Sequence, residues 1–478
     1  MSDVPTYEQL LTLVGELSAR VAELTEQNAR QAERIAELER KLGQNSGNSS
    51  LPPSSDRFGK PAPRSLRKAT GRKPGKQPGS PGTALRQIDD PDEVVDHVPA
   101  ACAGCRADLA GADAAGVVAR QVHDIPEVTT TVVEHRLHKR FCPRPDCGRV
   151  TTADAPPGVN AAAVYGPNLR ALAVYLVVYQ HVPVERAAQL ITDVCGAGCS
   201  TGWISSVLRA TGEALADTEK LIKTAITAAH LLHVDETSLN INGAKQWLHV
   251  ACTDKLTAYH LHESRGRAAV DDFAVLPGYT GIVVHDALSV YDGDKYQAAT
   301  HTLCGAHIAR ELVAAAETHP GQAWPNAALD ALYGLNDAAH AAREQGLPQI
   351  PPETAGPLLD NWRHAILCGL ATHPRRDCRK QSKTRNLLER LRDRDEQVLR
   401  FARDLRVPFT NNQAERDLRP AKTQLKISGC HRSSAGARAW LRIRGYISTT
   451  RKHGINTLTA LRDAITSNPW TPPVAIGT

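Results

Sequence analysis

The chain of 478 residues lacks any run of about 18 apolar residues, which excludes a helix of ordinary length that spans a membrane. Its first residues are polar and acidic, a composition that excludes a secretory signal peptide. The 11 cysteines are too dilute for a secreted disulfide scaffold. We therefore expect a cytoplasmic protein. Its length and its hydrophobic content of 41% are sufficient for several domains.

Acidic residues are absent from the segment 57–76, which carries eight basic residues. Glycine and proline are interspersed among them, so this segment cannot form a core. The residues before it are rich in Ser, Asn and Pro. We predict a basic disordered linker at 44–90 that contacts nucleic-acid phosphates, and a solvated tether is the alternative. The basic residues expected to bind DNA are Arg64, Arg67, Lys68, Arg72 and Lys73.

A heptad pattern occupies residues 1–43. Apolar residues recur at its a and d positions, and Asn28 interrupts the a series. The a positions are Val14, Val21, Asn28, Ile35 and Leu42, and the d positions are Leu10, Leu17, Leu24, Gln31 and Leu38. β-branched residues at a with leucine at d favour a parallel two-stranded coiled coil, and one buried asparagine fixes its register. The pattern predicts a helix that joins two or more copies of the chain. A helix packed on its own chain is the alternative.

Four of the cysteines form two close pairs, Cys102 with Cys105 and Cys142 with Cys147. Two such pairs can supply the four thiolates of a structural Zn²⁺ site. The second pair has four intervening residues, and residues 106–141 separate the pairs, so the spacing is looser than in a zinc ribbon. We predict a small β domain that binds zinc at 91–157. Four reduced cysteines without a metal are the alternative.

Residues 158–229 have a helical pattern interrupted by the sequence Gly196-Ala197-Gly198. Ser200 or Thr201 follows and can cap the next helix. A helix, a glycine turn and a capped helix are compatible with a helix-turn-helix that binds DNA. Ordinary helical packing explains the pattern equally well.

Two apolar runs each lead to an aspartate. Leu231–Val234 precedes Asp235, and Gly281–His285 precedes Asp286. We read both as buried strands that end near their aspartates. The order of elements over 230–300 is three strands, a helix and a fourth strand. A helical insertion is expected at 301–406. The segment 407–478 follows, with Glu415 at the start of a helix.

Basic residues accompany Glu415. Lys422 lies two helical turns beyond it and shares its face if the helix continues. Arg416 and Arg419 extend this surface, which is expected to contact DNA. Pro420 is expected to kink or divide the helix.

In their order, these stretches resemble the insertion-sequence-66 family of transposases. The segments that carry the resemblance are Gln44–Asp56, the two cysteine pairs, His233–Thr237, His285–Ala287, Cys304–Arg310 and Asn411–Arg416. The resemblance implies a catalytic core with an RNase H-like fold and a DDE triad that falls on Asp235, Asp286 and Glu415. It also implies cutting and joining at the ends of a mobile DNA element. The fold class expected is multidomain α+β/α: a coiled coil, a small zinc domain, a helical DNA-binding region, and an RNase H-like core with a helical insertion.

Hard oxygen ligands suit Mg²⁺ or Mn²⁺, and a pair of such ions serves phosphoryl transfer. The expected partners are DNA, further copies of this chain and helper proteins from the same element, and the expected location is the bacterial nucleoid in the cytoplasm. Glu236 is the rival ligand nearest to Asp235, but it should point to the other side of its strand. Two alternatives remain: a DNA-binding regulator without activity, and a nuclease of the same fold that does not join DNA.

Overall fold

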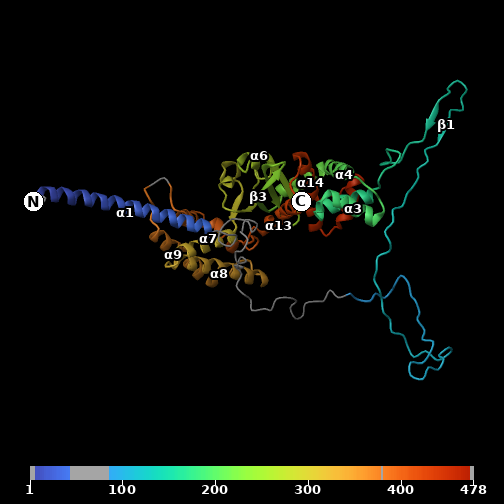
Figure 1. Ribbon diagram of the computed structural model, residues 1–478, viewed down its shortest axis with the longest axis horizontal. Helices are drawn as coiled ribbons and strands as arrows, with labels where there is room; N and C mark the ends of the chain where they lie inside the picture. The colour runs from blue at the N-terminus through green and yellow to red at the C-terminus, as the bar shows by residue number, and fades with distance from the viewer. Residues whose placement is uncertain (1–5, 44–84, 378–379, 474–478) are drawn as a thin grey trace, which may run out of the picture.

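The computed structural model describes residues 6–43, 85–377 and 380–473. The predicted linker residues Arg64, Arg67, Lys68, Arg72 and Lys73 lie outside them. Figure 1 shows one long helix projecting away from a body of a sheet and packed helices, and an extended excursion that carries a short hairpin. The projecting helix is α1 (Tyr7–Gly43), which agrees with the helical part of the heptad prediction. No described helix is both long and apolar enough to cross a lipid bilayer.

The body is built on a sheet of five strands in the order β5-β4-β3-β6-β7. Its strands are β3 (Leu231–Ile241), β4 (Ala244–Cys252), β5 (Thr257–His262), β6 (Ile282–His285) and β7 (Thr300–Leu303). Strand β4 is antiparallel to both β3 and β5, whereas β6 is parallel to both β3 and β7. Helix α6 (Arg267–Phe273) lies between β5 and β6 in the chain, as the sequence predicts. Strand β7 crosses the boundary that was expected at residues 300–301 between the first part of the core and the helical insertion.

Strand β3 is longer than predicted. Its apolar run ends at Val234, but the strand continues to Ile241, so Asp235 lies within it rather than near its end. From Ser238 to Ile241, exposed and buried residues alternate as in a strand with one face on a core, a period that a search for continuous apolar runs misses. Asn242 and Gly243 have φ of 47° and 80° and close a two-residue turn to β4. Such left-handed pairs match the strand twist in a hairpin.

Helices before the sheet form the region predicted to be helical. They are α2 (Pro167–Val174), the π-helix η2 (Tyr175–Tyr179), α3 (Val184–Cys195), α4 (Thr201–Ala214) and α5 (Ala216–Thr227). Helix α3 ends at Gly196, which is left-handed with φ of 65°, and the Ser200 hydroxyl caps α4 by accepting a hydrogen bond from the Trp203 amide at 3.1 Å. The sequence predicts both the glycine turn after α3 and the Ser200 cap of α4.

Helices after β7 fill the predicted insertion. They are α7 (Gly305–Thr318), α8 (Trp324–Glu344), α9 (Pro352–Thr372), α10 (Lys383–Asp393), α11 (Asp395–Val398) and α12 (Arg400–Arg403). Figure 1 shows α7, α8 and α9 on one side of the sheet and α3, α4 and α14 on the other. The two ends of the insertion meet, because the Gly305 amide donates to the Phe409 carbonyl at 2.8 Å. A β-carbon on Gly305 would lie 2.2 Å from the Phe409 ring, so this approach requires glycine.

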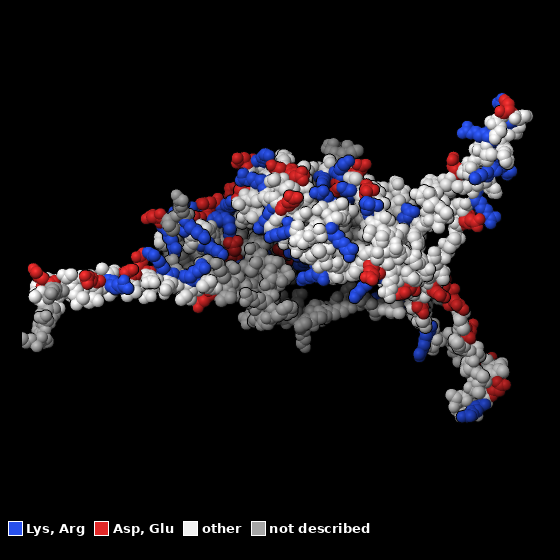
Figure 2. All heavy atoms as spheres, turned by 45° about the horizontal axis from the view of Figure 1, so that its top comes forward, with Lys and Arg blue, Asp and Glu red and all other residues white. Residues whose placement is uncertain are grey.

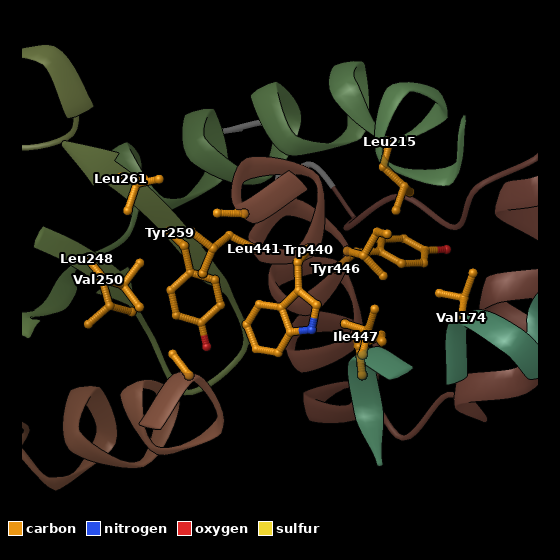
Figure 3. Packing of buried hydrophobic residues seen from close by; sticks show 14 of the residues in the cluster. Val174, Leu215, Leu248, Val250, Tyr259, Leu261, Trp440, Leu441, Tyr446 and Ile447 are labelled. Atoms are coloured by element: carbon orange, nitrogen blue, oxygen red, sulfur yellow. The ribbon is translucent and has the colours of Figure 1, made fainter. Parts of the chain in front are cut away.

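The chain ends in α13 (Asn412–Ser428), α14 (Ser434–Lys452) and α15 (Thr457–Ile465). Helix α13 is one helix that includes Pro420, so of the two predicted effects, a kink or a division, the division does not occur. Figure 3 shows Trp440 and Leu441 of α14 towards Tyr259 and Leu261 of the sheet, and Tyr446 and Ile447 of the same helix towards Val174 and Leu215. This core fixes the C-terminal helices to one face of the sheet.

Candidate active site

Strands β3 and β6 bring Asp235 and Asp286 to the same level of the sheet. His233 pairs with Val284 in the parallel register, and continuing that register by two residues sets Asp235 opposite Asp286. Asp286 follows the last residue of β6 directly. The Leu288 amide donates to its Oδ1 at 3.1 Å, and the Glu236 amide donates to the Asp235 Oδ1 at 2.8 Å. Two acids 51 positions apart in the chain thus become neighbours across two hydrogen-bonded strands.

Helix α13 packs on β3 and β4 and carries Glu415 in its first turn. The start of this helix is held by Asn411, which is 1% exposed. Its Nδ2 donates to the Val234 carbonyl at 2.8 Å, and its Oδ1 lies 2.8 Å from the His233 Nδ1, which is then the donor. Its backbone amide donates to the Cys304 Sγ at 3.2 Å. One residue therefore joins β3, the start of α7 and the start of α13.

Two aspartates at this end of the sheet have raised pKa values. Burial raises the pKa of Asp235 well above its usual value, and the charges of Glu236, Asp286 and Glu415 raise it further. Burial, followed by the charge of Glu236, raises the pKa of Asp286 to about 6. Like charges in a poorly solvated site favour either protonation or a bound cation. The donor set of carboxylate oxygens suits a hard divalent cation.

The charge of Glu236 acts on both aspartates, but its own carboxylate has other hydrogen-bond partners. Its side chain is 1% exposed and accepts hydrogen bonds from Arg265 at 2.9 and 2.6 Å and from the Tyr291 hydroxyl at 2.7 Å. These partners occupy its carboxylate, and they agree with the expectation that it points away from Asp235. Tyr291 belongs to the loop after Asp286, so Glu236 ties β3 to that loop.

Glu415 has a basic partner that the sequence did not suggest. The Arg310 guanidinium on α7 lies 3.7 Å from the Glu415 Oε1. Arg310 stands in the stretch Cys304–Arg310, which carries the resemblance, but nothing in that stretch indicates a residue more than 100 positions away as its partner. This stretch opens the first helix of the predicted insertion, since Cys304 is the residue before α7.

The predicted zinc ligands lie in two separate loops. Cys102 accepts backbone hydrogen bonds from Cys105 and Gly104, which lower the pKa of its thiol. Cys142 and Cys147 lie in the connection between β1 (Lys139–Phe141) and β2 (Val150–Thr152), which pair in an antiparallel hairpin. Across 6–43, 85–377 and 380–473, no three His, Cys, Asp or Glu side chains form a group able to hold a metal ion. The structure therefore gathers neither the four thiolates nor the three carboxylates into a closed coordination shell.

The basic residues expected to contact DNA lie along α13. Arg416 and Arg419 are exposed, and Lys422 is half-buried. Figure 2 shows Lys and Arg side chains interspersed with Asp and Glu over the visible face of the body. The local position of each cation beside the carboxylates is therefore more informative than the net charge of +6.

Comparison with known proteins identifies relatives of most of the chain. A family model described as "Transposase IS66 family" matches residues 162–439, more than half of the chain and including all three acids. A model described as a family of unknown function matches residues 3–86. An uncharacterized protein of Sinorhizobium fredii, y4hP, is 25% identical over 399 residues, which cover 76% of this chain and 69% of that protein.

Replacing Asn411 tests the anchor of α13. Asn411→Ala leaves the Val234 carbonyl and the His233 Nδ1 buried without partners, so the free energy of unfolding should fall by roughly 2–4 kcal/mol. The neighbouring Asn412 is exposed, and Asn412→Ala should change stability by less than about 0.5 kcal/mol. Urea denaturation of the three proteins measures both. Equal losses in the two variants would show that Asn411 is not an anchor.

Burial of Asp286, together with the charge of Glu236, should make stability depend on pH. An acid with a raised folded pKa favours folding at low pH, and that contribution is lost as pH rises from about 4 through about 6. Asp286→Asn removes the charge, so in chelator-treated protein it should raise stability at pH 8 by up to about 3 kcal/mol, and by less at pH 5. Thermal unfolding at both pH values tests this. A gain that shrinks towards pH 8 would contradict it.

Proposed function

The chain belongs to the IS66 family of transposases, and we propose that it catalyses metal-dependent cleavage and strand transfer of DNA at the ends of an insertion sequence. The proposal rests on one observation above all. Asp235 and Asp286 from two strands and Glu415 from a helix approach the same end of the sheet, where burial and then the charges of Glu236, Asp286 and Glu415 raise the pKa of Asp235. We assign Asp235, Asp286 and Glu415 as the DDE triad.

The order of the strands supports an RNase H-like catalytic core. Three antiparallel strands are followed, after a helix, by two parallel strands on the other side of β3. The central strand β3 carries the first acid, its parallel neighbour β6 delivers the second, and a helix packed on β3 delivers the third. This arrangement is the one expected for that fold with a helical insertion before the last acid.

The three carboxylates would hold Mg²⁺ or Mn²⁺. Such a pair of ions activates the attacking oxygen, water or a DNA 3′-hydroxyl, and stabilises the leaving oxygen of an in-line displacement. The protein's own contribution is orientation. The sheet fixes Asp235 and Asp286, Asn411 fixes the first turn of α13, and Arg310 holds the Glu415 carboxylate. Arg265 and Tyr291 keep Glu236 out of the set.

Several basic residues would hold the DNA. Arg416, Arg419 and Lys422 on α13 follow Glu415 and would contact backbone phosphates close to the reacting bond. The linker residues Arg64, Arg67, Lys68, Arg72 and Lys73 would add contacts that do not depend on sequence. The helices α3 and α4 would form a helix-turn-helix.

Helix α1 would join copies of the chain as a coiled coil. Its a and d residues are largely exposed: Val14 is 58%, Leu17 56%, Val21 62% and Ile35 56% accessible. A row of apolar side chains on a projecting helix is stabilised when a second copy covers it. Two copies would bring two active sites to the two ends of one element, with helper proteins from the element as further partners.

The cysteine pairs would bind a structural Zn²⁺. Backbone amides that stabilise a thiolate, as at Cys102, are a property of zinc knuckles. The proposed ligands are Cys102, Cys105, Cys142 and Cys147.

Strand transfer tests the triad directly. A labelled fragment from the element end is incubated with plasmid DNA and Mg²⁺ or Mn²⁺, with wild type, Asp235→Asn, Asp286→Asn and Glu415→Gln. Wild type should join the fragment to the plasmid, and each substitution should reduce joining at least 100-fold because it removes a metal ligand. Glu236→Gln, outside the proposed set, should retain more activity than any of the three.

The outcomes separate the rival functions. Cleavage without joining would favour the nuclease, and sequence-specific DNA binding without chemistry would favour the regulator. Joining that survives all three substitutions would overturn the assignment of the acids.

Asn28 tests the coiled coil. Asn28→Val removes the polar residue that specifies two strands, so the dimer should give way to a mixture with trimers or larger oligomers. Ala22→Val, at an outward-facing b position, is the matched control and should remain dimeric. Sedimentation equilibrium measures the masses. An unchanged dimer in Asn28→Val would refute this register.

A further inference from the structure

A cavity of about 700 Å³ opens beside the first turn of α13, at the other end of β3 from its hairpin. Its lining comes from the starts of β3 and α13, the loop between β4 and β5, and the segment before α13. Lys255, Arg406 and Arg416 face it with His230 and His233, and Asp254 is the one acid. Neither Asp235, Asp286 nor Glu415 lines it, so it is separate from the proposed catalytic site.

Two of these cations lack an anionic partner in the part of the chain that the structure describes. Within the described residues, neither Lys255 nor Arg416 forms an ion pair, whereas Arg406 pairs with Asp404 at 2.8 Å. The Arg416 Nε contacts the Asn412 carbonyl at 3.4 Å. Three cations and one acid line the cavity, and this excess of positive charge indicates an anionic ligand.

The backbone adds donors to the same place. Helix α13 has 17 residues and no side-chain cap, because the Asn411 side chain is bonded to β3 instead. The first amides of the helix therefore remain available, and Asn412 and Gln413 line the cavity. Free amides at a long helix N-terminus, together with guanidinium and ammonium groups, bind phosphate oxygens.

We propose that this cavity binds a backbone phosphate of the DNA strand that is cut, next to the phosphate at the carboxylates. The proposal rests on the DNA-directed function given above. The same turn of α13 carries Glu415 towards the triad and Gln413 and Arg416 towards the cavity, so a strand crossing the start of the helix meets both sites. His233 and Asp235 lie two residues apart on one face of β3, about 7 Å along the strand. Lys255 and Arg416 fix the register of the strand over the triad.

DNA binding without chemistry tests the proposal. Full-length protein with Asp235→Asn is titrated, without divalent metal, with fluorescent single-stranded and duplex fragments of the element end over a range of salt. Adding Lys255→Gln or Arg416→Gln should weaken binding about tenfold and reduce the slope of log K against log salt by about 0.7–0.9. Lys220→Gln removes one exposed cation on α5 and should change neither.

Single neutral methylphosphonates locate the phosphate. In a series of otherwise identical fragments, one position next to the cleaved bond should weaken binding by Asp235→Asn protein but not weaken it further when Arg416→Gln or Lys255→Gln is added. Strictly additive losses at every position, or unchanged salt slopes in both variants, would overturn the proposal.

Inorganic phosphate distinguishes a free anion from DNA. If calorimetry detects phosphate binding that Arg416→Gln abolishes while the DNA slopes stay unchanged, the cavity serves a free anion and the DNA assignment is wrong. The proposed reaction is tested separately, by the strand-transfer assay rather than by DNA binding. DNA bound through the cavity by a protein that joins nothing would leave this inference in place and refute the proposed reaction.

Discussion

The geometry of the candidate active site depends on one buried amide. Asn411 donates to β3, accepts from β3 and donates to the residue before α7, all within 3.2 Å. An amide offers a donor and an acceptor in fixed relation, so it matches a strand carbonyl and an imidazole at once. A carboxylate at this position would face the Val234 carbonyl with an acceptor. Because the side chain is used in this way, it leaves the helix amides uncapped beside the cavity, so the anchor of Glu415 also shapes the proposed phosphate site.

Much of the local structure could be predicted from the sequence. The heptads of α1, the turn at Asn242 and Gly243, and the Ser200 cap depend on neighbouring residues, and each has its own periodicity or turn chemistry. Errors arose where tertiary contacts outweighed local rules. Strand β3 continues through Asp235 because β4 pairs with it from His233 to Ile241. Helix α13 passes through Pro420 because packing against the sheet compensates for one missing hydrogen bond.

The three acids of the candidate site could be predicted from the sequence, but the arginines that contact the carboxylates could not. Two apolar runs marked Asp235 and Asp286, and family resemblance marked Glu415. The contacts of Arg310 with Glu415 and of Arg265 with Glu236 join residues distant in the chain, and no local pattern encodes such a pairing. The same holds for the cysteine pairs. The spacing of cysteines in the sequence describes each loop by itself, and it does not give the distance between the two loops.

The insertion between β7 and α13 begins and ends at one place, where Gly305 meets Phe409. It is therefore a closed insertion, and its length does not change the positions of the core elements that it connects. The entropy of closing such a loop grows only with the logarithm of its length, by about 0.6 kcal/mol for each doubling. Sequence distance between Asp286 and Glu415 is thus uninformative about their separation in space. Chains with shorter, longer or wholly different excursions can present the same three acids, provided that a glycine stands where the excursion leaves and an asparagine where it returns.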